Sequence, residues 1–126
     1  QPRTCGSRGS FPAVTPLTWR CELKSAALAH SRDMANNNFF DHTGSDGQSA
    51  GFRITSAGYS WSAWGENIAA GIPLSGVSAV MQAWIDSPGH CANLMGSLFS
   101  NFGAAKYSDS SSTYDVYWTQ VFGRPR

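Results

Sequence analysis

The stretch Gly65–Met95, GENIAAGIPLSGVSAVMQAWIDSPGHCANLM, decides the fold because it joins a buried polar segment to the most clearly periodic helix of the chain. The helix is predicted after Ser75, its expected N-cap, and its apolar positions recur at i, i+3, i+4 and i+7. These positions are Val77, Val80, Met81 and Trp84. Ser87-Pro88 ends this helix and predicts a second short helix through Gly89 to Met95, with His90 in its first turn.

The same stretch contains Glu66, one of only two glutamates, and His90, one of three histidines. Small and apolar residues surround Glu66, which predicts a buried carboxylate. A buried, ionised carboxylate needs a cationic partner, a metal or a raised pKa. Two interpretations stay open: a functional carboxylate, or a structural one that pairs with an arginine or caps loop amides.

Upstream, residues 19–37 predict an amphipathic helix of about five turns. Thr18 is its expected N-cap, and Asn36–Asn38 is expected to end it. Its apolar face consists of Leu23, Ala27, His30 and Met34. A lone histidine on such a face is typical of a packed, hydrogen-bonded core residue, so we do not assign His30 a ligand role.

A polar, glycine-containing loop over 41–47 follows Phe39 and Phe40, two aromatics that we expect to be buried. His42 on this loop is well placed to project into a cleft. Residues 48–58 predict a short helix with Gly58 as its C-terminal stop. Its inward side chains are expected to be Phe52, Ile54 and Ala57.

Two strands are predicted near the C-terminus, over 102–107 and 114–122. The second has apolar groups on both alternating faces, which indicates a central strand covered on both sides. Residues 1–18 contain three prolines and two glycines without periodicity, which indicates an irregular N-terminal arm. We therefore expect one α+β domain over residues 1–126, with helices on both faces of a small sheet.

Composition narrows the function classes. The 126 residues are 41% hydrophobic and only 13% charged, with a net charge of +1, so no electrostatic case exists for a nucleic-acid or anionic-membrane partner. No apolar run approaches the length of a transmembrane segment.

The chain begins at Gln1, so we expect that a signal peptide, a longer leader or other preceding sequence is not included. The three cysteines, at 5, 21 and 91, allow three disulfide pairings, among which spacing alone does not choose.

Five segments in order resemble the CAP superfamily, also called the SCP domain, which includes cysteine-rich secretory proteins, insect antigen 5 and the plant pathogenesis-related group. The segments are Ala29–Met34, Phe39–Thr43, Gly65–Ala69, Ser87–His90 and Tyr117–Gly123. The resemblance covers nearly the whole chain and is nearest to compact bacterial secreted members. It implies a three-layer α-β-α sandwich and secretion, and we expect a monomer.

The resemblance also implies a shallow cleft with two histidines and acidic residues, which in some members holds a divalent cation. His42 and His90 match the two histidines and would be the ligands of zinc or another divalent cation; Glu66 matches the glutamate of the GEN motif. Eukaryotic members often carry a further glutamate where this chain has Asp86-Ser87, so the fourth cleft position departs from that pattern. Bacterial relatives imply a Cys5–Cys91 disulfide, which would leave Cys21 free.

Two classes of function follow. The first is a secreted, non-enzymatic domain whose cleft binds a small molecule, a lipid or a cell-surface component; its expected lining is His42, Glu66, His90, Asp86 and Ser87. The second is a metal-dependent, peptidase-like hydrolase that uses His42, Glu66 and His90, a legitimate zinc set that leaves one position for water. A serine or cysteine hydrolase is disfavoured, because the Gly-x-Ser-x-Gly run at 47–51 follows a polar loop and not the strand that a nucleophile elbow requires, and because Cys91 is better explained as half of a disulfide. We favour the binding domain and assign no residue as catalytic.

Overall fold

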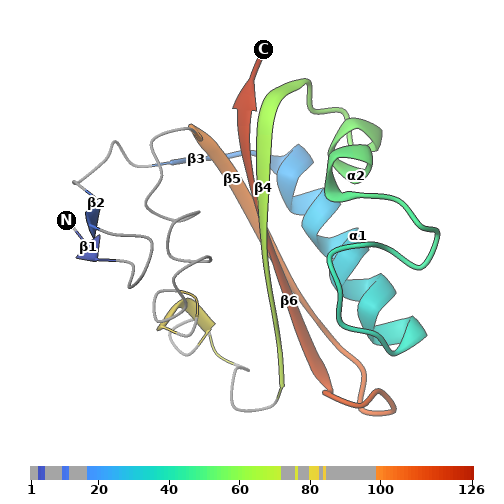
Figure 1. Cartoon of the computed structure of the whole chain (residues 1–126). Helices are drawn as coiled ribbons and strands as arrows, with labels where there is room; N and C mark the ends of the chain where they lie inside the picture. Colours follow the sequence, from blue (N-terminus) through green and yellow to red (C-terminus); the bar gives the residue numbers. More distant parts are fainter. Residues whose placement is uncertain are drawn as a thin grey trace.

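The structure, a computed structural model, describes residues 3–4, 10–11, 17–71, 76, 80–82, 84 and 99–126 (Figure 1). Its helices and strands are β1 (Arg3–Thr4), β2 (Ser10–Phe11), β3 (Thr18–Trp19), α1 (Cys21–Asn37), α2 (Ala50–Ser56), β4 (Trp61–Ala70), β5 (Asn101–Ser108) and β6 (Val116–Pro125). β1 and β2 pair with each other. The other strands form one sheet in the order β3-β5-β6-β4.

β6 is the central strand, paired antiparallel with β4 on one side and β5 on the other. Val121 of β6 lies opposite both Glu66 of β4 and Gly103 of β5. Residues 116–123 are all buried, which confirms the prediction of a strand covered on both faces. The strand begins at Val116 rather than at residue 114, because Asp115 has a φ of 67°, outside the extended range.

α1 packs against the sheet with the predicted face, since Leu23, Ala27, His30 and Met34 are all buried. It ends as expected at Asn37, where Asn38 takes a left-handed conformation with φ 53°. The predicted N-cap was wrong. Thr18 lies in β3, paired with Asn101 of β5, and Arg20 holds the N-cap position without a side-chain hydrogen bond.

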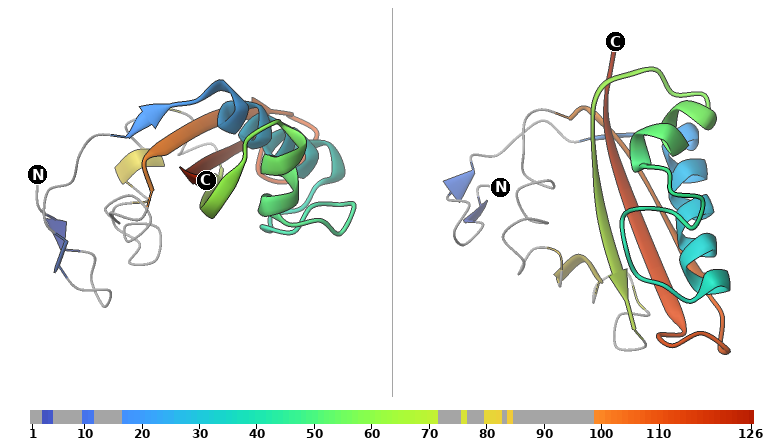
Figure 2. Two further views of the ribbon diagram at one scale, coloured as in Figure 1. Left: turned by 90° about the horizontal axis from the view of Figure 1, so that it is seen from above. Right: turned by 45° about the vertical axis from the view of Figure 1, so that its right-hand side comes forward.

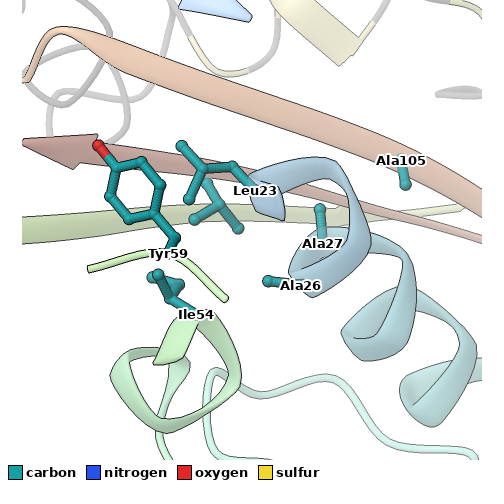
Figure 3. Close-up of a cluster of buried hydrophobic side chains, with 7 residues drawn as sticks. Leu23, Ala26, Ala27, Ile54, Tyr59 and Ala105 are labelled. Atoms are coloured by element: carbon teal, nitrogen blue, oxygen red, sulfur yellow. The ribbon is translucent and has the colours of Figure 1, made fainter. Parts of the chain in front are cut away.

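α1 and α2 cover the same face of the sheet, as the two views in Figure 2 show. Between helices and sheet lies a hydrophobic cluster, which is drawn in Figure 3. It comprises Leu23, Ala26, Ala27, Ile54, Tyr59, Ala105 and Val121. α1 approaches β5 so closely at Gly103 that a Cβ there would lie 2.3 Å from the backbone nitrogen of Lys24. The absence of a side chain at this position therefore sets the distance between helix and sheet.

Two aromatic residues expected to be buried are exposed. Phe52 is 50% exposed and Phe40 is 45% exposed, whereas Ile54 is fully buried and Phe39 packs at the edge of the core. Positions two apart in a helix lie on different faces, so Phe52 and Ile54 cannot both point inward. The α2 helix is also shorter than predicted, because Ser49 caps it by accepting a hydrogen bond from the amide of Phe52.

The opposite face of the sheet is covered by residues 80–82 and 84, which are helical. Val80 and Trp84 are buried against Ala69, Val116 and Trp118, as the predicted apolar face requires. The indole nitrogen of Trp84 donates a hydrogen bond to the carbonyl of Ile68 at 3.1 Å. Helical residues therefore lie on both faces of the sheet, and the α+β prediction is confirmed.

Several predictions fall on residues that the structure does not describe. They concern Ser75, Val77, the second short helix over 89–95, and the Cys5–Cys91 disulfide. Cys21, the cysteine that the structure describes, is exposed and not in a disulfide. None of the helices in the described ranges is long and apolar enough to cross a bilayer.

Candidate functional site

Glu66 lies in the middle of β4, where a strand between apolar neighbours places its side chain inside the protein. The side chain is 1% exposed. An ionised carboxylate at this depth is costly unless charged or hydrogen-bonding groups surround it. Two side chains from the helical layer meet this need, one from α2 and one from the loop before it.

Arg53 of α2 is the cationic partner. Its Nη2 donates to Oε2 of Glu66 at 2.8 Å, and the arginine side chain is only 12% exposed. The same Nη2 donates to the carbonyl of His42 at 2.9 Å, and Nη1 donates to the carbonyl of Gln48 at 3.3 Å. Arg53 thus neutralises the buried carboxylate and fastens both ends of the 42–48 loop.

His42 is the second partner of Glu66 and the exposed member of the cluster. Its Nδ1 lies 2.8 Å from Oε1 of Glu66, while its side chain is 56% exposed. Because the carboxylate can only accept, Nδ1 carries the proton, and in the neutral ring Nε2 is a bare acceptor. The hydrogen bond from Nδ1 to Glu66 raises the pKa of His42, against the opposing effect of partial burial.

His30 contacts the same loop from the buried side. It is fully buried, and its Nε2 donates to the carbonyl of Asp41 at 2.7 Å. Burial lowers the pKa of His30, which keeps the ring neutral, and its Nδ1 has no hydrogen-bond partner among the described residues. His30 and Arg53 therefore hold two consecutive carbonyls, those of Asp41 and His42. The prediction that His30 is a packed core residue is confirmed.

The structure thus brings together two of the predicted site residues, His42 and Glu66, and adds Arg53, which the sequence reasoning did not single out. The sequence left open whether Glu66 is functional or structural. The structure shows the arginine pairing of the structural interpretation, together with a contact to a histidine. A signal for Arg53 did exist. A cationic partner is one of the ways to satisfy a buried glutamate, and Arg53 lies in the first helix after the loop that carries His42. The other predicted site residues, His90, Asp86 and Ser87, lie outside the described residues.

The chemistry of this cluster fits a metal-binding histidine with a carboxylate behind it. Histidines that bind metals commonly donate their second ring N–H to a carboxylate, which fixes the tautomer and makes the free nitrogen more basic. His42 and Glu66 have this arrangement. Within the described ranges no three His, Cys, Asp or Glu side chains form a metal-binding group. Nε2 of His42 would be one ligand, Glu66 would orient it rather than bind the ion, and further ligands would come from elsewhere in the chain.

Comparison with known proteins places the chain in a family. Residues 13–122 match the model of the cysteine-rich secretory protein family, CAP. The uncharacterized protein YkwD of Bacillus subtilis is 36% identical over 109 residues, which is 86% of this chain and 40% of that protein. The uncharacterized membrane protein YlbC of the same organism is 32% identical over 90 residues, 71% of this chain and 25% of YlbC. The chain therefore spans less than half the length of these relatives.

Solved structures show the same fold. An extracellular protein containing a SCP domain from Bacillus anthracis superposes with a TM-score of 0.76 at 32% identity, over 88% of this chain and 34% of that one. An outer surface protein of Borrelia burgdorferi gives a TM-score of 0.77 at 22% identity, over 90% of this chain and 80% of its own. The match to the family model and the identity to the Bacillus proteins agree with the fold. The chain belongs to the cysteine-rich secretory protein (CAP) family.

Proposed function

We propose that the chain is an extracellular binding domain that uses the surface at His42 to bind a small molecule, a lipid or a cell-surface component. The observation that carries this proposal is the contrast between Glu66, whose side chain is 1% exposed, and His42, whose side chain is 56% exposed and hydrogen-bonded to it. The buried Glu66–Arg53 ion pair holds the imidazole of His42 in a fixed orientation at the surface. His90, Asp86 and Ser87 are proposed to complete the binding surface.

The location outside the cell is supported by relatives. One is described as an extracellular protein and another as an outer surface protein. A fixed imidazole is useful for binding because little rotational freedom is lost when a ligand contacts it. Arg53 and His30 add to this rigidity by holding the loop carbonyls beside His42. Binding at such a surface requires no proton transfer and no nucleophile.

A divalent cation is a second way for this surface to hold a ligand. We propose His42 and His90 as the side chains that would bind zinc or another divalent ion. Such an ion, when bound, would act as a Lewis acid toward an oxygen or nitrogen of the ligand. Glu66 holds the proton on Nδ1 of His42 and so keeps Nε2 free. Arg53 holds the other carboxylate oxygen, so Glu66 would orient His42 rather than bind the ion.

Calorimetric titration with zinc at pH 7.5 and pH 5.5 tests the metal form of the proposal. We expect binding at pH 7.5 that is lost in His42→Ala and in His90→Ala and weakens at pH 5.5, because protons compete for imidazole. Arg124→Ala, at an exposed position near the C-terminus, is the control and should bind as the parent does. Zinc binding that survives both histidine substitutions would refute the assignment.

If zinc does not bind, the proposal requires a ligand that contacts the His42 surface directly, without a metal ion. Lipid vesicles, peptides and cell-wall glycan fragments would then be screened against the parent and His42→Ala. A ligand that binds the parent and not His42→Ala would support the binding surface. Ligands that bind both proteins equally would contradict it.

A metal-dependent hydrolase is the alternative function, and one observation favours it. An imidazole that donates from Nδ1 to a carboxylate and has a bare Nε2 is the arrangement of a histidine that binds a catalytic zinc ion. In this alternative His42, Glu66 and His90 are used together. The existing contacts of Glu66 to Arg53 and His42 disfavour a role for Glu66 as a direct metal ligand. Turnover of a peptide substrate by zinc-loaded parent protein, with loss in His42→Ala, would establish the hydrolase over the binding domain.

A further inference from the structure

A groove between α1 and α2 lies beside the proposed binding surface; neither His42 nor Glu66 lines it, whereas their partner Arg53 does. Its volume is about 530 Å³, within the range of small-molecule sites. The lining residues are Ser25, Ala26, Ala29, Asp33, Ser45, Asp46, Phe52, Arg53, Ser56 and Ala57. The groove therefore combines small side chains, one aromatic ring and two carboxylates.

Small side chains create the space. Ala26 and Ala29 of α1 face Ala57 at the end of α2, and longer side chains at these positions would fill the gap between the helices. Phe52 forms part of the wall and is 50% exposed. A half-exposed phenyl ring offers its face to an apolar group or to a cation, which the negative charge of the ring face attracts.

The carboxylates give the groove its charge. Asp33 accepts hydrogen bonds from the amide and hydroxyl of Ser45 and from the side-chain amide of Asn37. Asp46 accepts from the amide of Gln48. In the part of the chain that the structure describes, these donors to both side chains are neutral, so they orient the carboxylates without cancelling their charge.

Arg53 is the one cationic side chain that lines the groove among the described residues. The positive charge of Arg53 is already paired with a carboxylate, because Nη2 lies 2.8 Å from Oε2 of the buried Glu66. The charged side chains that line the groove or contact its lining are thus three carboxylates, those of Asp33, Asp46 and Glu66, and one guanidinium. The groove favours an additional positive charge and disfavours an anion.

We propose that this groove binds a small organic cation, an ammonium or guanidinium group carried on an apolar body. The charged group lies near Asp33 and Asp46, and the apolar body lies on Ala29 and against Phe52. Hydroxyl groups of Ser25 and Ser56 are available to the remaining polar atoms of the ligand. Its charge comes from Asp33 and Asp46 and not from His42, so a failure of zinc to bind at His42 would not decide this proposal.

Calorimetry with four probes of similar length tests the charge preference. Cadaverine and agmatine carry cations, 1,5-pentanediol is the neutral analogue of cadaverine, and glutarate is an anion. We expect cadaverine and agmatine to bind, with affinity that falls as salt is raised, and no detectable binding of the diol or glutarate. Absence of binding by both cations, or equal binding of the diol, would overturn the proposal.

Variants locate the site. Asp33→Asn/Asp46→Asn is expected to weaken cadaverine binding by about tenfold or more. Ala29→Leu keeps every charge, fills the groove and should also abolish binding; because Ala29 is exposed on a helix, this variant is expected to fold. Asp109→Asn removes one charge outside the groove and should bind cadaverine as the parent does. A loss in Asp109→Asn comparable with that in the double variant, or full binding by Ala29→Leu, would contradict the assignment.

Discussion

At the scale of single residues, the burial of Glu66 governs the local chemistry. A carboxylate that is 1% exposed stays ionised only if its partners compensate for the lost hydration. Arg53 contributes the compensating charge and His42 an additional hydrogen bond. The orientation of His42 is therefore a consequence of the need to satisfy a buried charge.

Replacement of Arg53 measures this dependence. Arg53→Ala leaves the carboxylate of Glu66 without its cation, and we expect the free energy of unfolding to fall by about 3 kcal/mol, as when one partner of a buried ion pair is removed. Urea denaturation provides the measurement. Arg124→Ala, at an exposed arginine, is the control and should change stability by less than about 0.5 kcal/mol. A similar small change in Arg53→Ala would show that Glu66 is not held as described.

His30 predicts a pH dependence of stability. Burial lowers its pKa below the ordinary value of about 6.5, so the unfolded chain binds a proton more readily than the folded chain. The stabilising contribution is full above about pH 6.5 and decreases as the pH falls toward the folded pKa. Glu66 and Asp33 oppose this shift electrostatically and Arg53 adds to it.

Urea denaturation of the parent and His30→Gln between pH 7.5 and 5 tests this prediction. The parent should lose more stability over this range than the variant, which has no group to protonate at residue 30. His42→Gln is a useful comparison because the raised pKa of His42 works in the opposite sense, with stability lost as the pH rises. Identical pH profiles for the parent and His30→Gln would contradict the buried, neutral assignment.

The burial and contacts of single side chains were only partly predictable from the sequence. The sequence indicated that Glu66 is buried and that His42 projects from a loop, because local composition and glycine content report on both. The pairing with Arg53 depends on where α2 packs, which no local pattern encodes. Phe40 and Phe52 were misplaced because hydrophobicity alone does not say which aromatic side chain reaches the core.

At the scale of elements, the contact between α1 and β5 determines how the helical layer lies on the sheet. The position of Gly103 under Leu23 and Lys24 allows the helix backbone to come within a distance that a side chain would block. Helix periodicity identified α1 well because its apolar face is long. The start of the helix was less predictable, since β3 pairs Thr18 with β5 and so removes it from the N-cap position.

Substitution of this glycine tests the contact. In Gly103→Ala the new Cβ would lie 2.3 Å from the nitrogen of Lys24 and 2.6 Å from the carbonyl carbon of Leu23. Because both atoms are backbone, the helix must move, and we expect a loss of about 3 kcal/mol in the free energy of unfolding. Gly76→Ala, where none of the described residues lies within 4 Å of the added carbon, is the matched control and should be nearly neutral. Equal stability of the two variants would mean that α1 does not pack so closely on β5.

At the scale of the whole molecule, helical residues pack on both faces of the sheet. The α+β architecture was predictable because strand and helix patterns were strong and the family resemblance ordered them. The disulfide was not, because three cysteines allow three pairings and spacing does not select one. The pairing of Cys5 with Cys91 therefore stays a prediction.

Thiol titration tests this pairing. Cys21 is exposed and not in a disulfide, so one thiol per chain should react with a thiol reagent in the native protein. If Cys5 and Cys91 are bonded, the count stays at one after denaturation and rises to three after reduction. Three reactive thiols in the denatured, unreduced protein would exclude the disulfide. Cys21→Ser is the control and should show none before reduction.

The central claim is that Glu66 holds His42 by Nδ1 and leaves Nε2 available. Long-range ¹H–¹⁵N NMR of the histidine rings, followed through a pH titration, measures tautomer and pKa together, and His42→Gln identifies the signal. The structure predicts an Nδ1–H tautomer for neutral His42, a pKa above the ordinary value of about 6.5, and a lower pKa in Glu66→Gln. His30, bonded through Nε2, should show the opposite tautomer in the same spectrum. An Nε2–H tautomer for His42 with a pKa that does not respond to Glu66→Gln would contradict the account.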